Sequence, residues 1–246
     1  ACLPLLSEYG TWVGQHEGLF QAYKALRDSD EYLQLDESQR KVIDNTLRDF
    51  TLSGVALPPE KKQRFAQIQA RLSELSSTFS NNVMDATMGW TKHITDESEL
   101  AGLPESALAA AQQAAHQKDL QGWLFTLDIP SYLPVMLYAD NRALREEMYR
   151  AYATRASDQG PNAGEWDNTA IINETLALRS EIASLLGFAS YAERSLATKM
   201  ANSTSQVVGF LRDLAAKSKP QAEKELAEVR AYATEKHQMD ELEAWD

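Results

Sequence analysis

The sequence predicts a mainly α-helical fold, a multi-helix region that carries one small two-stranded antiparallel β-ribbon. Apolar residues recur every three or four positions along most of the chain, which is the pattern of helices that bury one face. Between about residues 89 and 128 this period gives way to two short alternating runs. Hydrophobic residues make up 43% of the 246 residues, enough for a substantial core.

In the first third of the chain, the spacing of apolar residues predicts helices. From about Leu3 to Tyr32, one helical face is indicated by Trp12, Leu19, Tyr23 and Leu26. The stretch from Asp36 to Gly54 predicts the next helix, whose apolar stripe consists of Ile43, Leu47 and Phe50. Gly54 is expected to end it in a left-handed turn.

A long helix is expected after Pro58 and Pro59, because the fixed φ of proline suits a first helical turn. Its apolar stripe comprises Phe65, Ile68, Leu72, Leu75, Phe79 and Val83. This spacing predicts about seven turns and a length of roughly 35–40 Å at 1.5 Å per residue.

The two strands of the predicted ribbon are Gly89–Thr95 and Gly122–Asp128. Both alternate in the way of a half-buried strand, and they are expected to pair as antiparallel neighbours. The segment Pro104–His116 between them is rich in alanine and predicts a short helix. Because an isolated two-stranded ribbon is marginally stable in water, we expect it to pack against helices.

The helical period returns after Pro130. One predicted face carries Leu144, Met148, Tyr152 and Arg155. A second carries Ile171, Thr175, Leu178, Ile182 and Leu185, and Gly187 is expected to end that helix. No repeat or linker predicts a firm internal boundary within residues 1–246.

The last helix is expected to begin at a cap supplied by Ser203–Ser205 and to carry Val207, Leu211 and Leu214. Pro220 interrupts it, and a proline inside a helix costs about 3 kcal/mol. We therefore expect a kink or a new helix at that residue. The residues predicted for the buried side beyond it are Leu226, Val229 and Ala233.

Charge and composition exclude several functions. The net charge is −12, from 36 acidic and 24 basic residues, which disfavours binding to nucleic acid or to an anionic membrane. No window approaches the roughly 18 apolar residues of a membrane span, and a secretory signal pattern is missing. The single cysteine, Cys2, forms no internal disulfide, which fits a reducing compartment. The start without Met and the end on Trp245–Asp246 indicate a piece of a longer protein.

The histidines do not form a metal-binding motif in the sequence. None of them lies within four residues of another: His16, His93, His116 and His237. His16–Glu17 resembles the beginning of the zinc motif His-Glu-x-x-His, but the fifth position is Phe20. We interpret these histidines as surface or boundary residues, and the sequence predicts no metal ligand.

The remaining candidate motifs are incomplete. Gly160–Gly164 lacks the lysine of a phosphate-binding loop, and Ser195–Lys199 is one residue too long for a Ser-x-x-Lys nucleophile. Acidic pairs are interpreted as solvated helix faces: Glu146 with Glu147, and Glu223 with Glu225. The polar loop Arg155–Gly160 is compatible with a functional contact, but a structural turn is the favoured interpretation. The sequence therefore predicts no catalytic residue and identifies no substrate-binding residue.

Four phrases resemble the thimet oligopeptidase family of zinc metallopeptidases. They are SNNVMDATMGWTK, DIPSYLPVMLYADNRALREEMYRAYATRASDQGPNAGEWDN, LLGFASYAERSLATKMA and KPQAEKELAEVRAYA. The resemblance covers essentially all 246 residues and corresponds to the N-terminal half of such an enzyme. It implies a mostly helical fold, a deep channel that admits short peptides, and cytoplasmic peptide degradation.

The family's chemistry requires a His-Glu-x-x-His helix and a further glutamate, which bind zinc and position a water molecule. None of these residues has a counterpart in this sequence. The resemblance therefore implies that residues 1–246 form a non-catalytic wall of the substrate cleft, inactive without the C-terminal catalytic half and without a cofactor of their own. Self-association through exposed apolar surface is expected. The alternative is an independent helical scaffold or peptide-binding module without catalytic activity.

Overall fold

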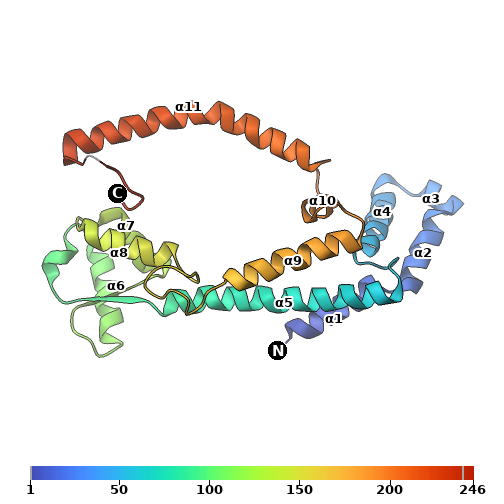
Figure 1. Ribbon diagram of the computed structural model, residues 1–246, viewed down its shortest axis with the longest axis horizontal. Coiled ribbons are helices and arrows are strands. Elements are labelled where there is room, and N and C mark those ends of the chain that lie inside the picture. The colour runs from blue at the N-terminus through green and yellow to red at the C-terminus, as the bar shows by residue number, and fades with distance from the viewer. Residues whose placement is uncertain (1, 240) are drawn as a thin grey trace. The chain divides into compact units, whose positions relative to one another are not determined.

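The computed structural model describes residues 2–239 and 241–246 (Figure 1). This part of the chain is mainly helical with one two-stranded antiparallel sheet, which confirms the predicted fold class. Its contacts divide it into two compact units. The N-terminal unit comprises the residues up to Thr78 together with Ile171–Arg212, and the ribbon unit comprises Phe79–Ala170 together with Asp213–Asp246.

The N-terminal unit begins with short helices rather than one long one. They are α1 (Leu3–Gly14), α2 (Glu17–Arg27), α3 (Asp30–Gln34) and α4 (Glu37–Leu52). The chain breaks before α2 because His16 acts as its cap, and the ring Nδ1 accepts the backbone N–H of Leu19 at 3.1 Å. A capping box of Asp36 and Gln39 starts α4. Gly54 follows α4 with a φ of 81°, as predicted.

A seam between two antiparallel helices forms the centre of the N-terminal unit. The helices are α5 (Pro59–Met88), which confirms the predicted long helix, and α9 (Thr169–Leu185). Phe65 and Ile68 of α5 and Ile182 of α9 are almost completely buried in the seam. Bidentate ion pairs cross its edges, from Arg64 to Glu181 and from Arg71 to Glu174, with N–O distances of 2.6–2.8 Å.

The ribbon unit contains the sheet and the helices that cover it. β1 (Thr91–Ile94) pairs with β2 (Trp123–Thr126) in the antiparallel orientation expected from the sequence, although both strands are shorter than predicted. Around them gather α6 (Glu105–His116), α7 (Ile129–Tyr138) and α8 (Arg142–Ala153), as Figure 1 shows. A 3₁₀ turn, η1 (Glu97–Leu100), leads toward α6.

One apolar core joins the ribbon to these helices. Its buried residues are Trp90, Ile94, Leu100, Leu103, Ala111, Phe125, Leu127, Val135, Ala139, Leu144, Met148 and Ala151. Neighbouring residues of β2, Leu124 and Phe125, point to opposite faces of the ribbon, and both are buried. Both faces are therefore covered, which explains how two strands of four residues remain paired.

The last helices differ from the sequence prediction. α10 (Tyr191–Leu196) is short, and α11 (Thr204–His237) continues through Pro220. Of the two alternatives expected at that residue, a kink or a new helix, the new helix is therefore excluded. The side chains around Pro220 are exposed. The carbonyl that loses its N–H partner can therefore bind water. None of the described helices combines the length and apolarity needed to cross a membrane.

The predicted buried side of the last helix is also wrong for two of three residues. Ala233 is buried, but Leu226 is 44% exposed and Val229 is 54% exposed. All residues from 208 to 232 are exposed. The apolar stripe is present, but the described chain places nothing against it.

Candidate functional site

The strongest sequence candidate, the polar segment Arg155–Gly160, lies in the loop after α8 that runs from Thr154 to Asn168. Its hydrogen bonds are mainly internal. The N–H of Gly164 donates to the carbonyl of Ser157, and that of Asn168 donates to the carbonyl of Ala156. The hydroxyl of Ser157 donates to the carbonyl of Thr154 and accepts the N–H of Gln159. These bonds support the interpretation of the loop as a structural turn.

The sequence predicted that Arg155 shares a helical face with Leu144 and Met148. This prediction is wrong, because α8 ends at Ala153. Its guanidinium donates to the carbonyl of Tyr152 at 2.9 Å and to Thr87 Oγ1 at 2.8 Å. It also lies 3.6 Å from the centre of the Tyr152 ring, which stacks on Tyr132 at 4.2 Å. Arg155 is thus held within the ribbon unit by several contacts.

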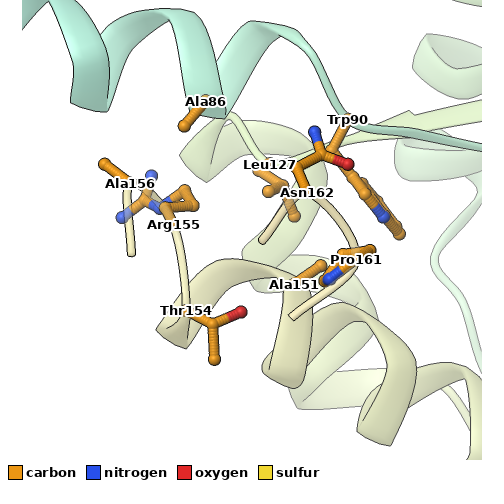
Figure 2. A pocket seen from close by; sticks show the side chains of 9 residues that line it. All are labelled: Ala86, Trp90, Leu127, Ala151, Thr154, Arg155, Ala156, Pro161 and Asn162. Carbon is orange, nitrogen blue, oxygen red and sulfur yellow. The ribbon is translucent and has the colours of Figure 1, made fainter. Parts of the chain in front are cut away.

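A small cavity lies beside this loop (Figure 2). Its lining combines apolar groups with the polar side chains of Thr154, Arg155 and Asn162. The space accommodates about one water molecule, which is far too small for a peptide residue. This cavity cannot serve as the substrate site.

Asn168 at the end of the loop is the one buried polar residue among those described, with 2% of its surface exposed. Its side chain accepts a hydrogen bond from Asn82 Nδ2 at 2.8 Å and donates to the carbonyl of Phe79 at 3.2 Å. It therefore ties the loop to the last turns of α5. Sequence reasoning missed it. Its position just before a predicted helix was a signal only for a cap, not for burial.

A larger groove lies on the ribbon unit, between α6, β2 and the start of α7. Its volume is about 480 Å³. One wall consists of Ala107, Ala110, Ala111 and Ala114, and the opposite end carries Asp128 and Ser131. The groove has the size and mostly apolar lining of a site for a small ligand or a few peptide residues.

Each histidine lies in its own local setting. His16 caps α2, and His93 Nε2 donates to the carbonyl of Gln121 at 2.6 Å. His116 is the last residue of α6, and His237 is the last residue of α11. Within residues 2–239 and 241–246, no group of three His, Cys, Asp or Glu side chains could hold a metal ion.

Ser195 and Lys199 are brought together, since Lys199 Nζ donates to Ser195 Oγ at 2.7 Å. A base that activates a serine must accept the hydroxyl proton, so this hydrogen bond runs in the wrong direction for an activated nucleophile. The acidic pairs have ordinary partners: Glu146 with Arg150, Glu147 with Lys92 of β1, Glu223 with Lys219, and Glu225 with Gln221.

Two family models match the chain. Residues 4–62 match the N-terminal domain of neurolysin and thimet oligopeptidase, and residues 135–246 match peptidase family M3. The chain is 65% identical over 244 residues to oligopeptidase A of Escherichia coli (strain K12). That match covers 99% of this chain and 36% of the relative.

Two further relatives extend the similarity. Oligopeptidase A of Haemophilus influenzae is 63% identical over 245 residues, covering 100% of this chain and 36% of that protein. The probable cytosolic oligopeptidase A of Arabidopsis thaliana is 42% identical over 243 residues, covering 95% of this chain and 34% of that protein. The chain thus spans about a third of the length of the curated relatives that it matches. It belongs to peptidase family M3.

Proposed function

We propose that this chain is the N-terminal, non-catalytic wall of a cytoplasmic zinc-dependent oligopeptidase, and that it does not hydrolyse peptides by itself. The observation that carries the proposal is its 65% identity to oligopeptidase A along 99% of this chain, while the match covers 36% of that relative. The family resemblance implies short peptides as the substrate. The name of the plant relative, a probable cytosolic oligopeptidase A, supports the compartment.

The donor groups of this chain do not suit a catalytic zinc ion. Such a site needs three converging protein ligands and an open position for water. The described residues contain no group of three His, Cys, Asp or Glu side chains that could hold a metal ion. We therefore assign zinc binding and water activation to the part of the relatives that this chain does not cover.

Exposed apolar helix faces support an interface with that remaining part. In α1, Leu5 is 65% exposed, Tyr9 is 63% exposed and Trp12 is 60% exposed. Similar faces occur on α7 and α11, and patches of this kind usually mark interaction surfaces. We propose that they contact the catalytic half in the whole enzyme and that they cause self-association when this chain is alone.

The test is restoration of activity. The purified chain is assayed with a quenched fluorescent peptide, alone and after co-expression with the rest of Escherichia coli oligopeptidase A. We expect no turnover and no stoichiometric zinc for the chain alone, and zinc-dependent turnover for the pair. Zinc-dependent hydrolysis by the chain alone would contradict the proposal. Light scattering of the isolated chain checks the expected self-association.

A second candidate function is a peptide-binding module that acts without a catalytic partner, and the groove beside α6 is the observation that favours it. Ala110 lines this groove, so Ala110→Phe should fill it and abolish binding of a fluorescent peptide. Ala177 lies exposed on α9, and Ala177→Phe is the matched control. Peptide binding that Ala110→Phe does not weaken would exclude the groove as the binding site.

A further inference from the structure

One side of α8 carries a cluster of arginines. Arg142 donates to Asp246 through Nε and Nη2, at 2.8 Å to Oδ1 and 2.7 Å to Oδ2. Arg145 adds a third hydrogen bond, from Nη2 to Oδ1 at 3.1 Å. The backbone N–H of Glu243 adds a fourth at 3.0 Å. The Asp246 side chain is only 3% exposed, and its carboxylate accepts all four of these hydrogen bonds.

The neighbouring Trp245 is held by the same helix. The side chain is 8% exposed, and its ring lies 5.7 Å from the Tyr149 ring and 4.9 Å from the Arg150 guanidinium. Arg145 Nε donates to the carbonyl of Trp245 at 2.7 Å, and its Nη1 donates to the carbonyl of Ala139 at 2.6 Å. A single arginine therefore joins the end of α7 to both Trp245 and Asp246.

These contacts contrast with the exposure of α11. Residues 208–232 of that helix are exposed, and the first buried side chain near its end is Ala233. The chain then turns, with the N–H of Met239 donating to the carbonyl of Ala233 and the hydroxyl of Thr234 donating to the carbonyl of Met239. Within the ribbon unit, the segment that follows this turn attaches to α8 through Trp245 and Asp246.

We propose that Trp245 and Asp246 form a latch on α8 that holds the C-terminal end of α11 to the ribbon unit. Opening the latch releases α11 from that unit as a helical arm. The two parts of the latch act together, because removal of the Asp246 charge leaves Arg142 and Arg145 without their shared carboxylate partner. The proposal of a latch does not depend on the proposed peptidase role, and it applies to the isolated chain.

The latch also has a defined response to acid. The hydrogen bond from Arg142 holds the pKa of Asp246 well below its usual range. A carboxyl group whose folded pKa is lowered stabilises the folded state above its unfolded pKa, and this stabilisation is lost as the pH falls through the lowered value.

The test compares Asp246→Asn with Asp213→Asn. Asp213 also pairs with a cation, Lys217 at 2.7 Å, but its side chain is 61% exposed on α11. Hydrogen exchange of the amides in residues 241–246 should accelerate at least tenfold in Asp246→Asn and remain unchanged in Asp213→Asn. Unchanged exchange in Asp246→Asn would overturn the proposal, as would equal acceleration in both variants.

Release of α11 is measured separately, by electron–electron distance measurements between spin labels at Lys224→Cys on α11 and Lys118→Cys after α6, in a Cys2→Ser background. The distance distribution should broaden with Asp246→Asn and not with Asp213→Asn. A distribution that stays narrow in Asp246→Asn would refute an arm held by the latch. If Asp246→Asn loosens β1 and β2, Arg142→Gln replaces it, since that variant keeps the bonds that Arg145 makes to backbone carbonyls.

Discussion

The ribbon unit encloses a continuous apolar core that extends from Trp90 to Ala151, whereas the central cluster of the N-terminal unit consists of Phe65, Ile68 and Ile182. The ribbon unit covers both faces of its sheet with helices. The N-terminal unit instead pairs two long helices along one seam, flanked by partly exposed ion pairs. The ribbon unit therefore has the larger enclosed core of the two units.

The largest expected effect is in the ribbon unit, at Met148→Ala. Met148 is completely buried in the core, so removing its side chain loses transfer free energy and leaves a cavity, at a cost of about 3–5 kcal/mol. Urea unfolding followed by hydrogen exchange of the β2 amides measures this loss. Met200 is 98% exposed, and Met200→Ala should change the free energy of unfolding by less than about 0.5 kcal/mol.

The corresponding change in the N-terminal unit is Ile68→Ala. Ile68 is completely buried, but a seam between two helices can close around the lost volume more easily than an enclosed core, so we expect about 2–3 kcal/mol. Hydrogen exchange of the α9 amides in urea measures this loss in the free energy of unfolding. Ile172 is 47% exposed on α9, and Ile172→Ala is the control. A loss equal to or larger than that of Met148→Ala would break the comparison between the units.

Asn168→Ala tests the polar tie within the ribbon unit. It removes both hydrogen bonds of a buried side chain, to the carbonyl of Phe79 and from the amide of Asn82, which should cost about 1–3 kcal/mol. Asn173 is exposed on α9, and the matched Asn173→Ala variant should be nearly neutral. Exchange of the amides in residues 155–168 should rise only in the first variant, and equal behaviour of both would assign Asn168 no special role.

The smallest effect is expected at the ion pairs of the seam. The hydrogen bond from Arg71 lowers the pKa of Glu174. Because this folded pKa lies below the unfolded one, the stabilisation is present above the unfolded pKa and is lost as the pH falls through the folded pKa. Glu174→Gln should therefore lower the melting temperature slightly at pH 7 and less at pH 3.

The dependence on salt is a second test of this prediction. The side chains of Arg71 and Glu174 are both about 40% exposed, so salt screens their attraction. The difference between Glu174→Gln and the unmodified chain should shrink in 1 M NaCl. Glu228 pairs with Lys224 at 3.8 Å on an exposed helix face, and Glu228→Gln is the control. A difference that is independent of both pH and salt would show that packing, not charge, is lost.

Most of the helices and both strands could be predicted from the sequence, because periodicity and caps depend on neighbours along the chain. The seam helix α5, the antiparallel pairing of the ribbon and the stop at Gly54 are examples. The extents of burial could not be predicted in the same way. Leu226 and Val229 form a correct apolar stripe, yet they are exposed because burial requires a partner surface and not only a pattern.

The candidate site shows the same difference between features that the sequence predicts and features that depend on the folded chain. The sequence favoured a turn for the loop after α8, and the internal hydrogen bonds of the loop support this interpretation. It could not place Asn168 or Asp246, because their partners lie about 90 to 100 positions away in the chain. The unit boundaries fall inside α5 and α11, where no change in composition would mark them.

The sequence by itself determined the helical class, the ribbon, the absence of a local metal-binding motif, and membership of peptidase family M3 through its long matching phrases. Only the tertiary structure decided which apolar faces are covered, which arginines share Asp246, and which loop groups are already satisfied. The physical reason is that secondary structure follows local sterics and hydrogen bonding, whereas burial and charge pairing depend on residues that only folding brings together.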